Sequence, residues 1–71
     1  MRYLVVIKRT DTGFSAYLPD VPGCVATGST SEETLQNMEE ALSFHAEGLQ
    51  LEGEPMPEPS SMSAYVGTAV A

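Results

Sequence analysis

Hydrophobic residues near the start of the chain form two short β-type patterns separated by turn residues. Residues 3–7 are apolar on both faces of an extended strand, which is typical of a strand that is covered on both sides and central in its sheet. Residues 10–13, Thr-Asp-Thr-Gly, have the composition of a turn. In residues 14–18 every second residue is apolar and faces the same way. The two segments are therefore expected to form a β-hairpin.

Proline and glycine predict a rigid corner at residues 19–23, which read Pro-Asp-Val-Pro-Gly. The two prolines fix φ and lack an N–H donor, and Gly23 can adopt a positive φ. Pro19 ends the second strand, so residues 24–27 are expected to form a short third strand.

A capping-box pattern predicts a helix that begins at Thr30. The hydroxyl of Thr30 should accept a hydrogen bond from the backbone of Glu33, and the Glu33 carboxylate should reach back to the amide of Thr30. Gly48 is expected to end the helix or fray it. One face should pack on the sheet, because apolar positions recur at spacings of three and four. These positions are Leu35, Met38, Leu42, His45 and Leu49.

The remainder of the chain divides into a proline-rich connector and an uncharged segment. Residues 52–60 hold three of the five prolines and are expected to be extended. Residues 62–70 are β-prone and lack charge, so they are expected to form a fourth strand. The predicted fold is one α+β domain over residues 1–71, with the order β-β-β-α-β and a mainly antiparallel sheet that carries one helix on one face.

The charge of the chain bears on its partners. Ten Asp and Glu residues stand against three bases, and those bases, Arg2, Lys8 and Arg9, all lie in the first nine residues. Such a surface repels phosphate backbones, so direct nucleic-acid binding is not expected and a basic protein partner is favoured. The alternative is that the acids only keep a small domain soluble.

Size and cysteine content predict association and location. A chain of 71 residues buries a small fraction of its surface, which favours a homo-oligomer, a dimer or tetramer. The single Cys24 cannot form an internal disulfide, and no stretch has the length of a membrane span or the pattern of a signal peptide. A cytoplasmic protein that does not contact membranes is the expectation.

The sequence offers no arrangement of residues suited to catalysis. Cys24 has no second cysteine and no nearby cation, and His45 is the only histidine, so neither predicts a metal site or a nucleophile. Cys24 is expected to be a small buried residue and His45 a packed, hydrogen-bonded one. Glu39 and Glu40 are adjacent on the helix and point in different directions, which does not suit a shared metal ion. No catalytic residue, cofactor or metal is therefore predicted, and the chain is not expected to be an enzyme.

The corner and the strand before it supply the candidate partner-binding residues. Tyr17 alternates with the apolar face of its strand, so its ring should point outward, where it could anchor an interface. The Asp20 carboxylate could pair with a basic side chain of a partner or cap its own turn, and both alternatives remain open. The candidate residues are Tyr17, Pro19, Asp20, Pro22 and Gly23.

Three segments together carry a resemblance to a known family. They are residues 17–28, Tyr-Leu-Pro-Asp-Val-Pro-Gly-Cys-Val-Ala-Thr-Gly, the Thr30-x-x-Glu33 helix start, and residues 54–59, Glu-Pro-Met-Pro-Glu-Pro. This combination resembles the HicB-like antitoxin family. The resemblance implies a partial ribonuclease H fold that binds and masks HicA, a small basic messenger-RNA endonuclease.

Within that family two functions remain open. The first is an antitoxin for a HicA-like toxin, and the alternative is a solitary oligomeric module that binds a protein or ligand and has no toxin. Many family members also carry a DNA-binding segment after this domain. The present sequence has no residues after Ala71 for such a segment, so autorepression by direct DNA binding is not expected.

Overall fold

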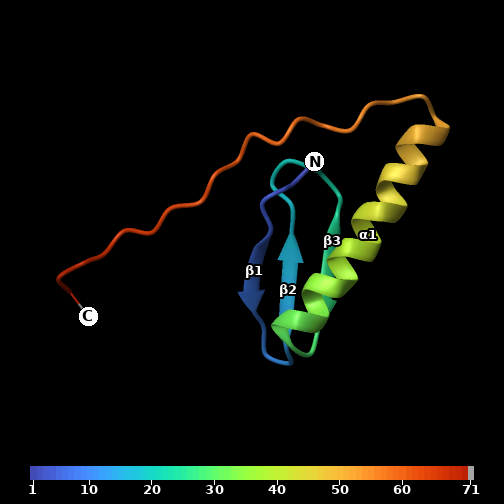
Figure 1. Cartoon of the computed structure of the whole chain (residues 1–71). Helices are drawn as coiled ribbons and strands as arrows, with labels where there is room; N and C mark the ends of the chain where they lie inside the picture. Colours follow the sequence, from blue (N-terminus) through green and yellow to red (C-terminus); the bar gives the residue numbers. More distant parts are fainter. Residues whose placement is uncertain (71) are drawn as a thin grey trace.

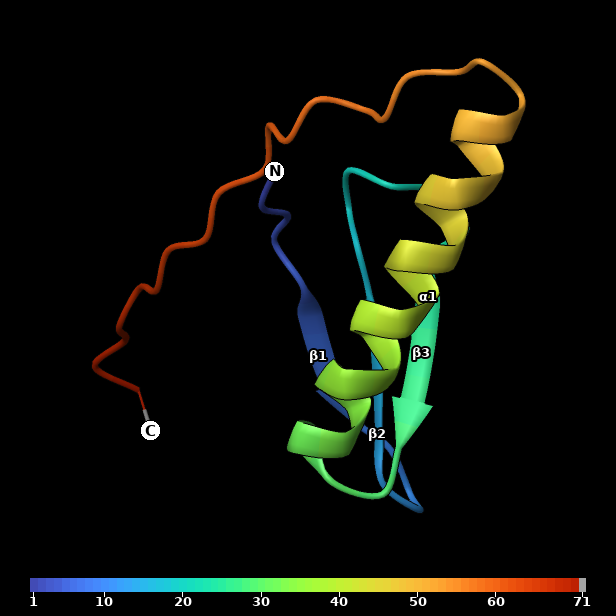
Figure 2. The same cartoon turned by 45° about the vertical axis from the view of Figure 1, so that its right-hand side comes forward.

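Three antiparallel strands and one long helix make up the folded part of the chain. The computed structural model describes residues 1–70. The strands are β1 (Val6–Arg9), β2 (Phe14–Tyr17) and β3 (Val25–Gly28), and the helix is α1 (Ser31–Leu51). The sheet has the order β1-β2-β3, and α1 crosses one of its faces, mainly over β3 and β2 (Figures 1 and 2). The predicted α+β class and the hairpin of the first two strands are confirmed.

The first strand differs from its prediction in position and in extent. It begins at Val6 and lies at the edge of the sheet, whereas residues 3–7 at the centre were expected. The turn explains the extension to Arg9. The Thr10 amide donates to the Gly13 carbonyl at 2.8 Å and closes the turn directly after Arg9, so Lys8 and Arg9 pair with Ser15 and Phe14 of β2. The apolar character of residues 3–5 serves the core instead, since Tyr3 and Val5 pack against it.

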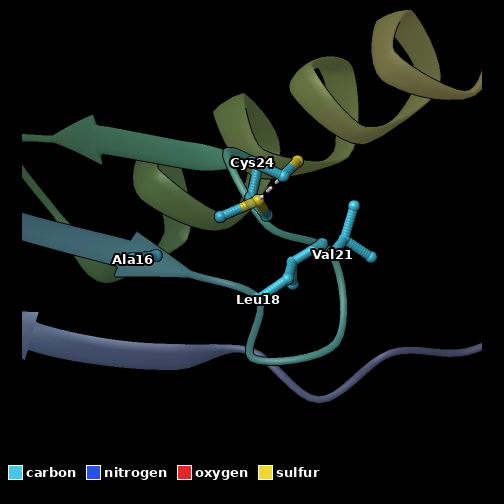
Figure 3. Close-up of a cluster of buried hydrophobic side chains, with 5 residues drawn as sticks. Ala16, Leu18, Val21 and Cys24 are labelled. Carbon is cyan, nitrogen blue, oxygen red and sulfur yellow. Dashed lines mark hydrogen bonds between the residues drawn. The ribbon is translucent and has the colours of Figure 1, made fainter. Parts of the chain in front are cut away.

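The hydrophobic core lies between the sheet and α1, close to the predicted corner. Val21 is completely buried, and Cys24 Sγ lies 3.8 Å from Met38 Sδ (Figure 3). Of the predicted helix stripe, Met38 is buried, whereas Leu35 is 40% exposed and the other three positions are half-buried. The corner is therefore part of the core. The buried apolar residues are Ala16, Leu18, Val21, Cys24 and Met38.

The helix start confirms one half of the predicted capping box and corrects the other. Thr30 Oγ1 accepts from the Glu33 amide at 3.0 Å, as predicted. The Glu33 carboxylate accepts from the Ser29 amide at 2.7 Å, not from that of Thr30. Thr30 has an extended backbone, which brings the preceding N–H within reach of the carboxylate. The Thr34 hydroxyl, fully buried, donates to the Thr30 carbonyl at 2.7 Å and closes the first turn.

The helix ends later than predicted. It continues through Gly48 to Leu51, and the residue that ends it is Gly53, with φ +74°. The Gly53 amide donates to Gln50 O at 3.1 Å and the Glu54 amide donates to Leu49 O at 2.8 Å, which together form a Schellman motif. Only a position with positive φ requires glycine, so Gly48 could remain helical. Its 21 residues make α1 about 30 Å long, and its second half extends beyond the short strands (Figure 2).

The predicted fourth strand is not formed in the part of the chain that the structure describes. Residues 62–70, hereafter the tail, are extended but pair with no strand, and they run away from the sheet (Figure 1). Tyr65 is 100% exposed and Val66 is 96% exposed. The prediction was wrong for this chain because β-propensity forms a strand only where an edge pairs with it. Of the predicted connector, residues 54–60 are extended, as expected, whereas Glu52 and Gly53 form the turn that ends the helix (Figure 1).

Candidate partner-binding surface

The corner between β2 and β3 is closed by hydrogen bonds within its own backbone. The Leu18 amide donates to Cys24 O at 3.4 Å, the Val21 amide to Leu18 O at 3.2 Å, and the Cys24 amide to Val21 O at 3.2 Å. Gly23 has φ +84°, which confirms the expected positive φ. With the backbone closed in this way, Leu18, Val21 and Cys24 point inward, and the two prolines lie at the surface.

The predicted partner-binding residues come together at this end of the sheet. Pro19, Pro22 and Gly23 are exposed, and Tyr17, at the end of β2, is 44% exposed. Because the corner backbone is bonded to itself, this rim offers a rigid surface that loses little conformational entropy on binding. Asp20 lies in the same loop, but its carboxylate is already engaged by the protein.

Asp20 holds the connector against the corner. Its carboxylate accepts hydrogen bonds from the amides of Ser60 (3.0 Å) and Ser61 (2.9 Å) and from both serine hydroxyls, at 3.1 and 2.8 Å. The Ser61 amide, then the Ser61 hydroxyl and Ser60, lower the pKa of Asp20 from 3.8 to about 2. The Asp20 carboxylate therefore does not cap its own turn, and it is not free at the surface. We call this set of bonds the Asp20 clasp.

Tyr17 faces away from α1, as predicted, and two residues that the sequence did not single out flank it. The register pairs Val6 with Tyr17 and Tyr17 with Val25, so the three side chains form a row across the sheet face opposite the helix. Val25 is 65% exposed and Val6 is half-buried. The strand register was the signal that could have identified them. This row is an apolar surface beside the corner, hereafter the open-face row.

The other candidate side chains have structural positions. Cys24 is buried, and its burial raises the pKa of the thiol, which disfavours the nucleophilic thiolate. His45 is half-buried beside the corner, in a shallow cleft of about 280 Å³ that Gly23 and Phe44 also line. No hydrogen bond to the His45 ring is formed within residues 1–70, so only its packing follows the prediction. Among those residues, no three His, Cys, Asp or Glu side chains are grouped as a metal site would require.

Charge is segregated between the two sides of the fold. The exposed surface of α1 is acidic, and the bases lie at β1 or just before it. The Arg9 guanidinium lies 5.8 Å from the centroid of the Phe14 ring, which places that charge over the hairpin end. A basic partner would therefore meet attraction from α1. The helix acids are Glu32, Glu33, Glu39, Glu40 and Glu47.

Comparison with known proteins now adds to this geometry. A sequence model described as HicB_like antitoxin of bacterial toxin-antitoxin system matches residues 3–69. The chain belongs to this HicB-like antitoxin family. An uncharacterised 14.9 kDa protein of Haemophilus phage HP1 is 36% identical over 66 residues, which is 93% of this chain and 50% of that protein. A UPF0150 protein of Synechocystis is 39% identical over 57 residues, 79% of this chain and 72% of the relative.

Solved structures of HicB-like antitoxins share the fold. A chain of the HicA3 and HicB3 toxin-antitoxin complex aligns with TM-score 0.71 at 40% identity, covering 83% of this HicB-like chain and 70% of the other. The antitoxin HicB3 crystal structure aligns with TM-score 0.70 at 42% identity, covering 80% and 42%. The chain thus spans about half the length of the phage relative and less than half of that HicB3 chain. Within residues 1–70, no helix combines the length and apolar character that crossing a membrane needs.

Proposed function

We propose that residues 1–71 act as a single HicB-like domain of a cytoplasmic antitoxin that binds and masks a small basic toxin of the HicA kind. The observation that carries the proposal is the family match over residues 3–69, together with a structural neighbour titled as a HicA3 and HicB3 toxin-antitoxin complex. In this proposal the chain works by binding alone, without catalysis, a cofactor or direct contact with nucleic acid.

The charge distribution supports a basic partner. The chain has ten acidic residues and three lysine or arginine residues. From Thr10 onward it has no lysine or arginine, and His45 is the only histidine. Complementary charge accelerates encounter and excludes acidic partners, while the apolar contact determines how long the complex lasts. An RNA-cleaving toxin needs a basic surface for its substrate, so an acidic antitoxin would compete with RNA for that same surface.

The corner rim and the open-face row supply the apolar part of the proposed interface. Tyr17 belongs to both, because it ends β2 beside Pro19 and lies between the two valines of the row. An exposed tyrosine on a rigid strand is a typical interface anchor. In the proposal, Tyr17, Pro19, Pro22 and Gly23 contact the partner, and Asp20 contributes by keeping the connector in place.

A toxin-neutralisation assay tests the proposal. The HicA3 toxin serves as one probe, and any short basic reading frame beside the gene of this chain serves as the second. Co-expression of this chain should restore growth that the toxin arrests, and the purified pair should co-elute at moderate salt. No rescue and no complex with either probe would favour the solitary oligomeric module.

Matched variants separate the proposed surface from general loss of apolar area. Tyr17→Ala removes a residue of the proposed interface, whereas Leu51→Ala removes an apolar side chain that is 90% exposed at the far end of α1. We expect Tyr17→Ala to weaken binding at least tenfold and Leu51→Ala to leave it unchanged, because interface anchors commonly contribute about 2 kcal/mol or more. If both variants bind with equal affinity, the corner rim and the open-face row are not part of the interface.

A further inference from the structure

The tail has the features of a β-strand whose partner is missing. All nine residues of the tail are exposed, and the large apolar ones range from 77% exposure for Val70 to 100% for Tyr65. In an extended conformation residues 62, 64, 66, 68 and 70 share one face, and all of them except Thr68 are apolar. An uncharged β-prone segment with an apolar face is costly to leave in water and prone to pair with a sheet edge.

The outer edge of β1 can accept such a strand. β1 pairs only with β2 within the described part of the chain, so its other side presents unpaired backbone groups. The opposite edge is less open, because the Thr27 carbonyl of β3 accepts a hydrogen bond from the Asn37 side chain at 2.8 Å. α1 also lies mainly over β3 and β2, which leaves β1 the less covered edge (Figure 2).

A cleft next to the residues that precede β1 would receive the apolar face of an added strand. It has a volume of about 340 Å³ and lies between the start of the chain and α1, where Tyr3, Val5, Leu35 and Leu42 line it. Leu35 is 40% exposed there although it belongs to the stripe that was predicted to pack on the sheet. A fourth strand along β1 would cover this cleft and bury Leu35.

The tail of the same chain does not fill this edge. Two contacts fix the connector: the Tyr3 hydroxyl donates to Pro57 O at 2.6 Å, and the Asp20 clasp holds Ser60 and Ser61. Beyond the clasp the tail diverges from β1 into solvent (Figure 1). The clasp therefore presents the tail outward, toward another molecule.

A second copy can meet the β1 edge through its tail without bringing acidic groups together. α1 carries five glutamates and no lysine or arginine, so contacts between two copies through α1 would be repulsive. The edge of β1 carries Lys8 and Arg9, and the tail carries no charge at all, so their meeting brings no acidic groups together. We propose that the tail of one copy adds to the β1 edge of a second copy as the fourth strand of its sheet, and that the exchange is reciprocal. This inference does not depend on the toxin.

Hydrogen exchange combined with sedimentation tests the exchange of strands. We expect the full chain to be a dimer at ~0.5 mM, with amides of residues 63–69 and the β1 amides that point away from β2 protected at least ~100-fold. Both protections should be lost together on dilution. A monomer at that concentration would overturn the proposal. A dimer whose tail exchanges at the rate of an unfolded peptide would also overturn it, as would tail protection that is independent of concentration.

Two variants at one position provide the control. Val66→Pro removes a backbone donor from the strand and should abolish the dimer. Val66→Thr keeps the amide and the β-branched shape and should leave the dimer in place. Val66 is 96% exposed in the single chain, so neither change should disturb the folding of residues 1–51, which circular dichroism of α1 would verify. Dimers formed equally by both variants would contradict the proposal.

Discussion

Two four-residue segments of identical composition adopt different structures in this chain. Residues 25–28, Val-Ala-Thr-Gly, form β3, whereas residues 66–69, Val-Gly-Thr-Ala, lie in the unpaired tail. β3 follows a corner that turns the chain back along β2 and lies beneath α1. The tail follows a connector that is clasped to the corner and pointed away. Local propensity therefore describes what a segment can form, and the edge available to it determines what it does form.

The folded region and the tail should differ most in how much stability is lost when a methionine side chain is removed. Met38 is 2% exposed, so Met38→Ala should leave a cavity in the core and lower the free energy of unfolding by about 2–5 kcal/mol. Met62 is 89% exposed, so Met62→Ala should change it by less than about 0.5 kcal/mol at concentrations where the chain is monomeric. Urea unfolding at low concentration measures both. Equal losses would show that the tail packs on the domain.

Two glycines give the next contrast. A Cβ at Gly13 would collide with the carbonyl oxygen of Gly28 and lie 3.1 Å from Ser29 Cα, both backbone atoms that cannot move aside. Gly13→Ala should therefore lower the free energy of unfolding by about 1–3 kcal/mol. A Cβ at Gly67 meets nothing within 4 Å, so Gly67→Ala should be close to neutral in the monomer. Thermal melts of the two variants would reveal the contrast, and a neutral Gly13→Ala would mean that the turn can open.

Most of the folded region could be predicted from the sequence because its signals are local. The Thr10–Gly13 turn, the rigid corner and the Thr30 cap each depend on a few neighbouring residues, and each is present. Two errors are local, namely the helix end, which lies at Gly53 and not Gly48, and the amide that Glu33 accepts from, which is that of Ser29. The larger errors concern longer-range choices. Neither the position of β1 at the sheet edge nor the pairing of the tail is encoded in its own segment, because both depend on which other strand lies alongside.

The helix start supplies a smaller effect within the folded region. Thr30→Ala removes the hydroxyl that accepts from the Glu33 amide and should cost about 0.5–2 kcal/mol. Ser29→Ala keeps the backbone N–H that donates to Glu33 at 2.7 Å and loses only a 3.2 Å hydroxyl contact, so its cost should be smaller. Chemical denaturation of both variants tests the cap. A larger loss for Ser29→Ala would place the capping residue one position earlier.

The Asp20 clasp joins the two regions and should respond to pH. The folded pKa of Asp20, about 2, lies below its ordinary value of 3.8. The clasp should therefore be complete above pH 4 and be lost as the pH falls through 2, because the protonated carboxyl is a weaker acceptor. Amide chemical shifts of Ser60 and Ser61 would report the transition, and Asp20→Asn should remove it. Shifts that titrate near pH 4 would show that the clasp does not hold in solution.

The candidate site was less predictable than the fold, and Asp20 shows why. The sequence placed it correctly at a corner, but its partners are Ser60 and Ser61, forty residues further along the chain. Val25 was missed for a similar reason, since its place beside Tyr17 follows from the strand register and not from its neighbours in sequence. The roles of Tyr17, Pro19, Pro22 and Gly23 in partner binding stay predictions.

The central claim is that the folded region is stable in a single chain, whereas the tail forms a strand only on a second copy. The concentration dependence of thermal unfolding tests this claim most directly. For the full chain, Tm should rise by roughly 3–5 °C for each tenfold increase in protein concentration where the dimer predominates. The Val66→Pro chain should unfold at one Tm throughout, equal to that of the full chain at high dilution. A full-chain Tm that does not change with concentration, or a Val66→Pro Tm that rises in parallel with it, would contradict this account.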